Sequence, residues 1–499
     1  MVPANARLGP VAAMSLVAGS MLGIGIFIAP PAVASQINTP AAFLVVWLLG
    51  GLSALCGALS IAELGAMMPR AGGDYPYLRL AYGPGLAFAT GWLQLLAVFP
   101  GSLAAMAVGT SAFQLPIVLG DAYFWPETLG LDPSIAWASA IIIGLTAVNH
   151  IGVLVSGRLQ IVVTVAPVAM LLLGTAGVML HQGTHAGAFA TEGVDLRLPG
   201  FAAMAAAFLP VYFAFSGWNA AIFVGAEIDR PGRNVPRALV GGTLAVTLLY
   251  LALCVGFLSV FTMGALANTG EAGTAAARLL FGGVGEFAVT VSILLAMLGS
   301  LNGTIMTGSR ISFAMANDGH CIAAAASTSR RFGTPAVALW MQAGWALVLV
   351  FSHGFEALMN YASAAMLITG TLTVTAVFVL RRKLPKMLRP YRAWGYPVTP
   401  ALYVLSSVGV LGVLAHNGHA SVFTGVGWFV LALGFHYLVV RRKVRGFGER
   451  RAGSVAGPMS GHGADDCIEL EAGLATKLGA EHDAELGHKL GHELGHELG

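Results

Sequence analysis

Charged residues are scarce in this chain. Asp, Glu, Lys and Arg make up only 10% of the 499 residues, whereas an ordinary globular domain carries about 25%. A chain with so few charges cannot turn most of its surface to water. This composition argues against an intrinsically disordered chain and against a typical soluble enzyme.

Cysteine and the common catalytic motifs are also nearly absent. The four cysteines (Cys56, Cys254, Cys321 and Cys467) form no Cys-x-x-Cys spacing, so we expect neither a disulfide scaffold nor a metal site built on them. There is no HExxH, no GxSxG and no phosphate-binding loop ending in Gly-Lys-Ser/Thr. A repeated selectivity-filter loop, as in a channel, is missing too. We therefore predict that the protein is not an enzyme and has no cofactor. The net charge of +3 argues against a nucleic-acid partner.

Long apolar runs are what the sequence has in abundance. Hydrophobic residues account for 57% of the chain, and a helix needs about 20 of them in succession to cross a bilayer. Twelve such runs predict an all-α integral membrane protein, at roughly 11–35, 40–68, 86–114, 133–155, 158–180, 200–228, 236–262, 284–316, 335–352, 357–380, 399–416 and 421–441.

The positive charges predict the orientation of these helices. With both termini in the cytoplasm, only Arg197 and Arg278 of the 26 Lys and Arg residues fall outside, as the positive-inside rule requires. The basic clusters at 381–392 and 441–451 fit contact with anionic lipid, with docking of a partner as the alternative. A plasma membrane or a bacterial inner membrane fits this pattern.

The tail from 442 to 499 differs from the rest of the chain. It is polar and ends in a His/Gly/Glu repeat in which His488, His492 and His496 recur every four residues. On a helix these histidines would share one face and could hold a metal. The alternative, a disordered low-complexity cytoplasmic tail, is our prediction.

Two of the apolar runs are interrupted by glycine. The first contains Gly19, Gly23 and Gly25, each of which weakens a helix by about 1 kcal/mol relative to Ala. The sixth reads Phe-Ser-Gly-Trp-Asn at 215–219. Unwound backbone is tolerated in a membrane only where it is buried in protein or lines a cavity.

The spacing of the two interruptions predicts an inverted-repeat transporter, because they lie five helices apart. We expect a cytoplasmic N-terminus at 1–10, a first five-helix repeat at 11–180 and a second, inverted one at 181–380. Helices 11 and 12 at 381–441 would be additions.

Broken helices can bind an amino acid by its backbone groups. The free N–H groups and the dipole of a half-helix favour a carboxylate, and free carbonyl oxygens can receive an ammonium group. The alternative is that these glycines only allow helices to pack closely.

Six ordered motifs across residues 8–440 resemble the amino acid–polyamine–organocation superfamily, most closely its L-type amino acid transporter branch. They are GSMLGIGIF at 19–27, AELG at 62–65, GGDYPY at 72–77, FSGWN at 215–219, DRPGRNVPRA at 229–238 and GSLNG with Ser309-Arg310 at 299–310. The resemblance implies a LeuT-like fold with five-plus-five inverted repeats and about 12 transmembrane helices. It also implies transport of amino acids by alternating access.

The resemblance also implies substrate-binding residues at matching positions. Backbone contacts to the substrate fall on Met21, Gly23 and Gly25. Phe213 matches an aromatic gate, Ser216 and Gly217 match the break in helix 6, and Asn219 matches a polar residue that faces the pocket.

Two departures from the family pattern affect this expectation. Ile24 replaces a serine, which removes a hydroxyl and adds apolar volume to the pocket, so that affinity falls or a different head group is favoured. Pro167 aligns with a lysine of helix 5 in many relatives. The coupling ion therefore stays open between sodium, a proton carried by another group, and plain exchange.

A few single residues are candidates for gating or ion pairing. Glu63, near the cytoplasmic end of helix 2, is expected to pair with an arginine, with a proton relay as the alternative. Glu227 and Arg310 are expected to belong to a gate network or to the interface. Trp218 either lines the pocket or packs beside it, and His150 and His436 are expected to be satisfied or interfacial.

The substrate and the partners follow from the same residues. Neither break contains an acid, and Ile24, Phe213 and Phe215 are apolar, so we expect a neutral, rather apolar amino acid. A cationic amino acid or polyamine antiporter of the same superfamily is the alternative. Some mammalian relatives bind a glycoprotein through a cysteine between helices 3 and 4. Residues 115–134 contain none, so we expect no disulfide-linked heavy chain there.

Overall fold

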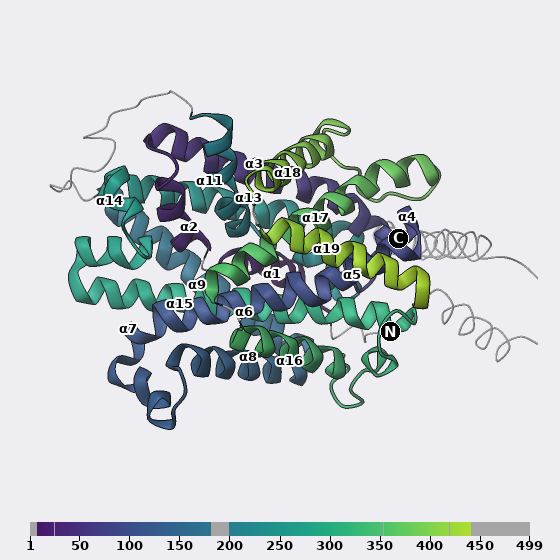
Figure 1. The fold of residues 1–499 in the computed structure, drawn as a ribbon, viewed down its shortest axis with the longest axis horizontal. Helices are drawn as coiled ribbons and strands as arrows, with labels where there is room; N and C mark the ends of the chain where they lie inside the picture. The colour runs from purple at the N-terminus through teal and green to yellow at the C-terminus, as the bar shows by residue number, and fades with distance from the viewer. Residues whose placement is uncertain (1–6, 24, 181–198, 353, 419, 441–499) are drawn as a thin grey trace, which may run out of the picture.

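The computed structural model of the protein is built almost wholly from helices (Figure 1). It describes residues 7–23, 25–180, 199–352, 354–418 and 420–440. In these ranges ten helical stretches are long and apolar enough to cross a membrane, and Ala202–Ala214 and Ala336–Ser352 are shorter apolar helices. Ten and two make up the twelve predicted segments, which confirms the all-α multi-pass fold.

Helix 1 and helix 6 are both broken, as predicted. Helix 1 consists of α1 (Pro10–Met21) and α2 (Gly25–Ala34). Helix 6 consists of α11 (Phe201–Ala214) and the short α12 (Ala220–Phe223). Between them Gly217 has a φ of 92°, which glycine adopts without the steric cost of a Cβ.

The two broken helices run in opposite directions. At the start of helix 1, the Leu8 N–H donates to the Glu227 carbonyl at 2.7 Å, and the Asp229 N–H donates back to Leu8 at 3.0 Å. The second half of helix 1, α2, packs against α11, the first half of helix 6. This opposed pairing is the arrangement expected of inverted repeats. The boundary between the repeats stays a prediction, since 181–198 lie outside the described residues.

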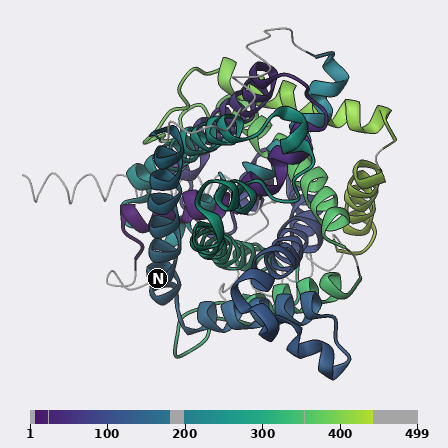
Figure 2. The ribbon, with the colours of Figure 1, turned by 90° about the vertical axis from the view of Figure 1, so that its left-hand side faces the viewer.

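The other helices surround this pair. They are α3 (Pro40–Met67), the run α5 (Pro84–Leu93), η2 (Gln94–Val98), α6 (Phe99–Gly109), η3 (Thr110–Gln114) and α7 (Leu115–Leu119), then α8 (Pro133–Ile151), α9 (Val153–Leu180), α13 (Pro231–Val260), α15 (Ala272–Asn317), α16 (Ala336–Ser352), α17 (Phe355–Lys383), α18 (Val398–His416) and α19 (Ala420–Phe435) with η7 (His436–Val440). Figure 2 views several of them end on. Short helices α4 (Asp74–Tyr82) and α14 (Met263–Ala267) connect spans, and η4 (Gly120–Leu129), η5 (Gly225–Glu227) and η6 (Ala323–Ala326) are 3₁₀ turns.

Two spans carry backbone details that hydropathy did not predict. A short helix from Ala272 precedes the eighth span and is separated from it by a kink at Gly282, where φ is 65°, so the span itself begins close to the predicted residue 284. The third contains two π-helical turns, η2 and η3. Hydropathy reports only apolar character, so it gives no sign of either a kink or a π turn. Such π turns are frequent at functional sites.

The interior is packed around helix 1. The half-helix α1 contacts α9, α12, α13 and α15, and Trp47, Tyr250 and Tyr403 are fully buried around the breaks. On the outer helices large apolar side chains remain exposed, for example Leu405 on α18 at 68% and Leu431 on α19 at 66%. Exposed apolar surface of this kind suits contact with lipid.

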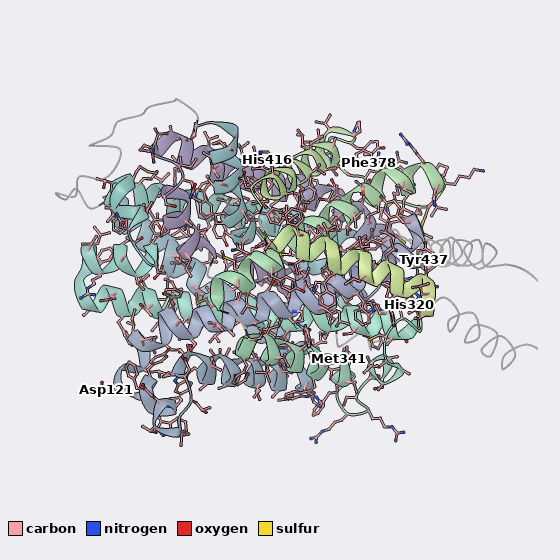
Figure 3. All side chains as sticks on the ribbon, viewed as in Figure 1. Asp121, His320, Met341, Phe378, His416 and Tyr437 are labelled. Atoms are coloured by element: carbon pink, nitrogen blue, oxygen red, sulfur yellow. The ribbon has the colours of Figure 1, made fainter. Side chains whose placement is uncertain are left out.

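Segments that connect or end the spans lie at both ends of the helical bundle. Asp121 in η4 lies at one end of the long axis, and His320 and Tyr437 lie at the other (Figure 3). The predicted tail from 442 and the first six residues are outside the described chain.

Candidate functional site

A cavity lies where the two broken helices meet. Helix 6 supplies much of its wall. The rest comes from helix 1, helix 3 (α5 to α7), helix 8 (α15), helix 10 (α17) and helix 11 (α18). Its lining residues are Ser20, Gln94, Val98, Phe99, Ser102, Met106, Tyr212, Ser216, Gly217, Trp218, Asn219, Ala220, Phe223, Thr304, Thr307, Met366, Thr369, Gly370 and Tyr403. None of these described residues has a charged side chain.

The break in helix 6 borders the cavity directly. Ser216, Gly217 and Asn219, predicted to bind substrate, all line it. Trp218 lines it as well, and its ring packs edge-on against Tyr403 at 5.5 Å between centroids. Trp218 therefore both faces the cavity and packs against a neighbouring helix.

Met21, Gly23 and Gly25, the described members of the predicted set in helix 1, are not among the residues that line the cavity. Met21 is buried, and its carbonyl accepts a hydrogen bond of 2.6 Å from the Tyr250 hydroxyl, which also lies 3.1 Å from the Ala214 carbonyl. A Cβ on Gly25 would lie 2.5 Å from the Cα of Ala214. Gly25 thus allows the second half of helix 1 to pack onto helix 6, which is the packing alternative of the sequence analysis.

The remaining predicted residues are placed as follows. Gly23 is buried, its N–H donates to the Met21 carbonyl at 2.8 Å, and a Cβ there would meet Ser300 Oγ at 3.1 Å. Phe213 is 5% exposed and is not among the residues that line the described cavity. Ile24 lies outside the described residues.

Among the described residues of helix 1, Ser20 is the one that lines the cavity. Its hydroxyl is buried and has no hydrogen-bond partner among the described residues. Its carbonyl accepts from Ser300 Oγ at 3.0 Å. A buried polar group without a partner is costly, so this hydroxyl is suited to bind a ligand. The sequence analysis placed Ser20 within the first-helix motif but missed its role; a hydroxyl beside the first break was the available signal.

Four aromatic residues of the lining form what we call the aromatic wall: Phe99, Tyr212, Phe223 and Tyr403. The hydroxyls of Tyr212 and Tyr403 lie 3.0 Å apart, and Phe99 packs against Phe223 at 5.2 Å between ring centroids. The sequence analysis missed Tyr403 because helix 11 lies outside the two predicted repeats. The sequence analysis also missed the Ser, Thr and Met residues of helices 3, 8 and 10 that line the cavity, because a single residue of these types forms no motif in an apolar helix.

Glu63 lies outside the cavity in a buried ion-pair cluster. Its carboxylate is 1% exposed and accepts from Arg381 Nη2 at 2.6 Å and from Arg389 Nε at 3.1 Å. The backbone N–H of Ala393 donates to it at 2.7 Å. Both carboxylate oxygens are therefore engaged, as expected of a fixed ion pair. The cluster joins helix 2 to the end of helix 10, which carries Arg381, and to the loop between helices 10 and 11, which carries Arg389 and Ala393.

A second buried ion pair joins the end of helix 6 to helix 8. Arg310, 2% exposed on α15, approaches Glu227 at 3.1 Å. Arg310 Nη1 also donates to the Met306 carbonyl at 2.6 Å. This pair lies just after the break in helix 6, where a movement of that half-helix would disturb it.

The two histidines of the sequence analysis lie away from the cavity. His150 Nδ1 accepts from the Trp340 indole at 3.3 Å, and His436 packs among aromatic rings, including Phe88 at 5.2 Å. No group of three or more His, Cys, Asp or Glu residues suited to a metal occurs in the part of the chain that the structure describes.

Comparison with known proteins agrees with this architecture. A family model of amino acid permeases matches residues 8–438. The serine/threonine exchanger SteT of Bacillus subtilis is 30% identical over 414 residues, which is 81% of this chain and 90% of that protein. The mouse Asc-type amino acid transporter 1 is 31% identical over 440 residues, covering 85% and 81%. The human large neutral amino acids transporter small subunit 2 is 28% identical over 440 residues, again covering 85% and 81%.

The family match covers nearly all of the described helices, and the resemblance inferred from the six motifs is confirmed. The fold, with broken helices 1 and 6 beside a cavity whose described lining is uncharged, is that expected of the family. The protein is an integral, multi-pass membrane protein that belongs to the amino acid permease family.

Proposed function

We propose that the protein is a secondary-active transporter that moves neutral, largely apolar amino acids across a membrane by alternating access. The observation that carries the proposal is the cavity between the two broken helices, whose described lining includes no charged side chain. A lysine or arginine side chain bound there would bury its charge without a partner, which is costly. Two of the relatives are named as an exchanger of serine and threonine and a transporter of large neutral amino acids, which agrees with neutral substrates.

The substrate's amino and carboxylate groups are proposed to bind at the breaks. Ser20 and residues 216–219 offer a hydroxyl, a second hydroxyl, an amide and unwound backbone on one side of the cavity. The remaining lining combines the aromatic wall and the methionines of helices 3 and 10 with uncharged polar side chains, namely Gln94, Ser102, Thr304, Thr307 and Thr369. Such a lining suits a neutral amino acid whose head group lies at the breaks.

Orientation and assembly belong to the same proposal. The distribution of Lys and Arg supports cytoplasmic N- and C-termini, in a plasma membrane or a bacterial inner membrane. The segment between helices 3 and 4 has no cysteine, so we propose that no heavy chain is attached there by a disulfide. The human relative is named a small subunit, but nothing in the cavity requires a second chain.

Transport by purified protein in liposomes tests the function. We expect labelled leucine to enter vesicles loaded with unlabelled leucine, with neutral amino acids competing and arginine, lysine and polyamines competing poorly. Entry that needs internal amino acid but no gradient identifies an exchanger, and gradient-dependent entry into empty vesicles identifies a symporter. Uptake of arginine at the rate of leucine, or competition by polyamines alone, would instead support the cationic antiporter.

Asn219→Asp should change selectivity rather than folding. Asn219 lines the cavity, and the substitution adds a negative charge with little change of shape. We expect arginine and lysine to compete at least tenfold better in the variant, because their charge gains a partner. Asn268→Asp, in an exposed turn at the end of α14, should leave competition unchanged. Equal competition profiles for both variants would place the substrate side chain away from Asn219.

A further inference from the structure

A buried acid lies just behind the cavity wall. Asp74 begins α4, the short helix between the second and third spans. It is 1% exposed, and its Oδ2 accepts a 2.6 Å hydrogen bond from Gln94 Nε2. Gln94 in turn lines the cavity. One side chain therefore separates this carboxyl from the space proposed to hold the substrate.

The ionisable neighbours of Asp74 do not neutralise it. The helices α5, α15 and α17 pack against α4, and α5 has no ionisable residue. Tyr77, Tyr212 and Tyr403 are the tyrosines whose hydroxyls interact electrostatically with the carboxyl. The charged groups nearby are engaged elsewhere: Arg79 with Asp318, Arg310 with Glu227, Arg381 with Glu63, and Lys383 with the Ala81 carbonyl. His320 Nδ1 lies 2.6 Å from the Tyr75 hydroxyl.

The cluster around Asp74 contains more hydrogen-bond acceptors than donors. Asp74 Oδ1 and Gln94 Oε1 are both buried acceptors without a partner in the described chain. Thr373 of α17 also interacts with the carboxyl, but its hydroxyl proton is donated to the Thr369 carbonyl at 2.9 Å. A proton on Asp74 would remove an uncompensated buried charge and supply a new donor to this cluster.

The electrostatics agree with this interpretation of the hydrogen bonds. Burial removes water from the carboxylate and raises the pKa of Asp74 to about 7, while hydrogen bonding to Gln94 and Thr373 acts in the opposite direction. Burial therefore favours the neutral acid at this position.

The structure links this carboxyl to the cavity on two sides. Gln94 is the first residue of the π turn η2 in the third span. Thr373 lies one helical turn after Thr369 and close to Gly370, both of which line the cavity. A change of charge on Asp74 therefore acts on the wall that Gln94 and helix 10 form.

We propose that Asp74 is a proton-binding site of the transport cycle and that Gln94 transmits its protonation state to the substrate cavity. Protonation converts the carboxylate to the neutral acid, whose O–H can donate to Gln94 Oε1, so that Nε2 no longer has to donate to a charged carboxylate. The Nε2 group then becomes available to the cavity. Substrate binds the protonated protein more tightly, so its affinity falls as the pH rises through the neutral range. The substrate part of this inference rests on the proposed function.

The test compares the pH dependence of leucine affinity in wild-type protein and in Asp74→Asn. Leucine exchange is measured in liposomes between pH 5.5 and 8.5, with equal pH on both sides so that no proton gradient contributes. We expect the wild-type affinity to fall by up to tenfold per pH unit above the midpoint, the limit for one linked proton. Asp74→Asn, a neutral isostere of the acid, should keep the high affinity throughout the range. A variant that retains the wild-type pH profile would overturn the proposal.

Gln94→Leu provides a second variant in case Asp74→Asn does not fold. It removes the amide that links the carboxyl to the cavity, so leucine affinity should become nearly independent of pH. A variant that retains the wild-type pH dependence would contradict the proposal. A uniform loss of affinity with the pH dependence intact would contradict it equally, because Gln94 would then contact the substrate without transmitting the charge of Asp74.

A measurement without substrate separates this proposal from the proposed function. An acid whose pKa is higher in the folded chain contributes stability below its unfolded pKa and loses it as the pH rises to the folded value. For Asp74 this window runs from 3.8 to about 7. Relative to Asp74→Asn, the melting temperature of the wild type should therefore fall across the window and level off above it. A constant difference would reject the proton site, whereas absence of leucine transport with this trend intact would reject only the proposed function.

Discussion

Alanine at Gly217 is expected to lower amino acid transport at least tenfold in protein that still folds. Gly217 has a φ of 92°, a region in which a Cβ costs about 1–3 kcal/mol. A Cβ there would lie 2.6 Å from the carbonyl oxygen of Ser20, so the backbones of the two breaks must move apart. A loss of about 1.4 kcal/mol in binding corresponds to a tenfold loss of affinity.

The effect of Gly217→Ala should arise from the cavity and not from backbone strain alone. Gly282, at the kink of α15, also has positive φ, at 65°, but a Cβ there meets nothing within 4 Å. Gly282→Ala should therefore lower the melting temperature without changing leucine affinity. Leucine affinity measured by exchange in liposomes distinguishes the two variants. Equal affinity in both would mean that contact between the breaks does not shape the binding site.

Glu63→Gln is expected to destabilise the protein more than any of the other substitutions proposed above. The carboxylate is 1% exposed and pairs with Arg381 and Arg389, the latter itself 7% exposed. The substitution removes one charge from a buried cluster and leaves two guanidinium groups facing an amide. Breaking a buried pair in this way typically costs about 3–5 kcal/mol.

An exposed ion pair provides the control for Glu63→Gln. Arg79 and Asp318 lie 2.8 Å apart, but their side chains are 45% and 24% exposed. Such pairs contribute about 0–1 kcal/mol, so Asp318→Asn should shift the melting temperature only slightly. Thermal unfolding in detergent, followed by tryptophan fluorescence, compares the two variants. Similar shifts would show that the Glu63 cluster does not hold helix 2 to the loop between helices 10 and 11.

Apolar length and glycine placement were enough to predict the architecture. The twelve segments, an interruption of helix 1 around Gly19, Gly23 and Gly25, and one of helix 6 at 215–219 were predicted, because hydrophobic thickness sets the length of a span and glycine weakens a helix locally. The kink at Gly282, just ahead of the eighth span, and the π turns of the third were not predicted. Hydropathy has no term for backbone geometry, so a kink within an apolar segment gives no signal.

The site was predicted less completely. The break in helix 6 was predicted residue by residue, and Ser216, Gly217 and Asn219 line the cavity. Tyr403, Met106 and Gln94 were not predicted. Each comes from a helix whose face toward the cavity is set by its packing against neighbours far away in the sequence. The face cannot be read from periodicity when a helix is apolar all round.

The sequence by itself determined that this chain spans a membrane many times and that helices 1 and 6 unwind, since composition and local helix propensity decide both. Only the tertiary structure decided that Gly25 serves close packing against Ala214, that Ser20 reaches the cavity, and that Asp74 is buried behind Gln94. The first two outcomes depend on distances between residues far apart in the sequence, and the third depends on the folding of a short connecting helix. Such distances are set by the packing of whole helices, so local sequence patterns do not predict them.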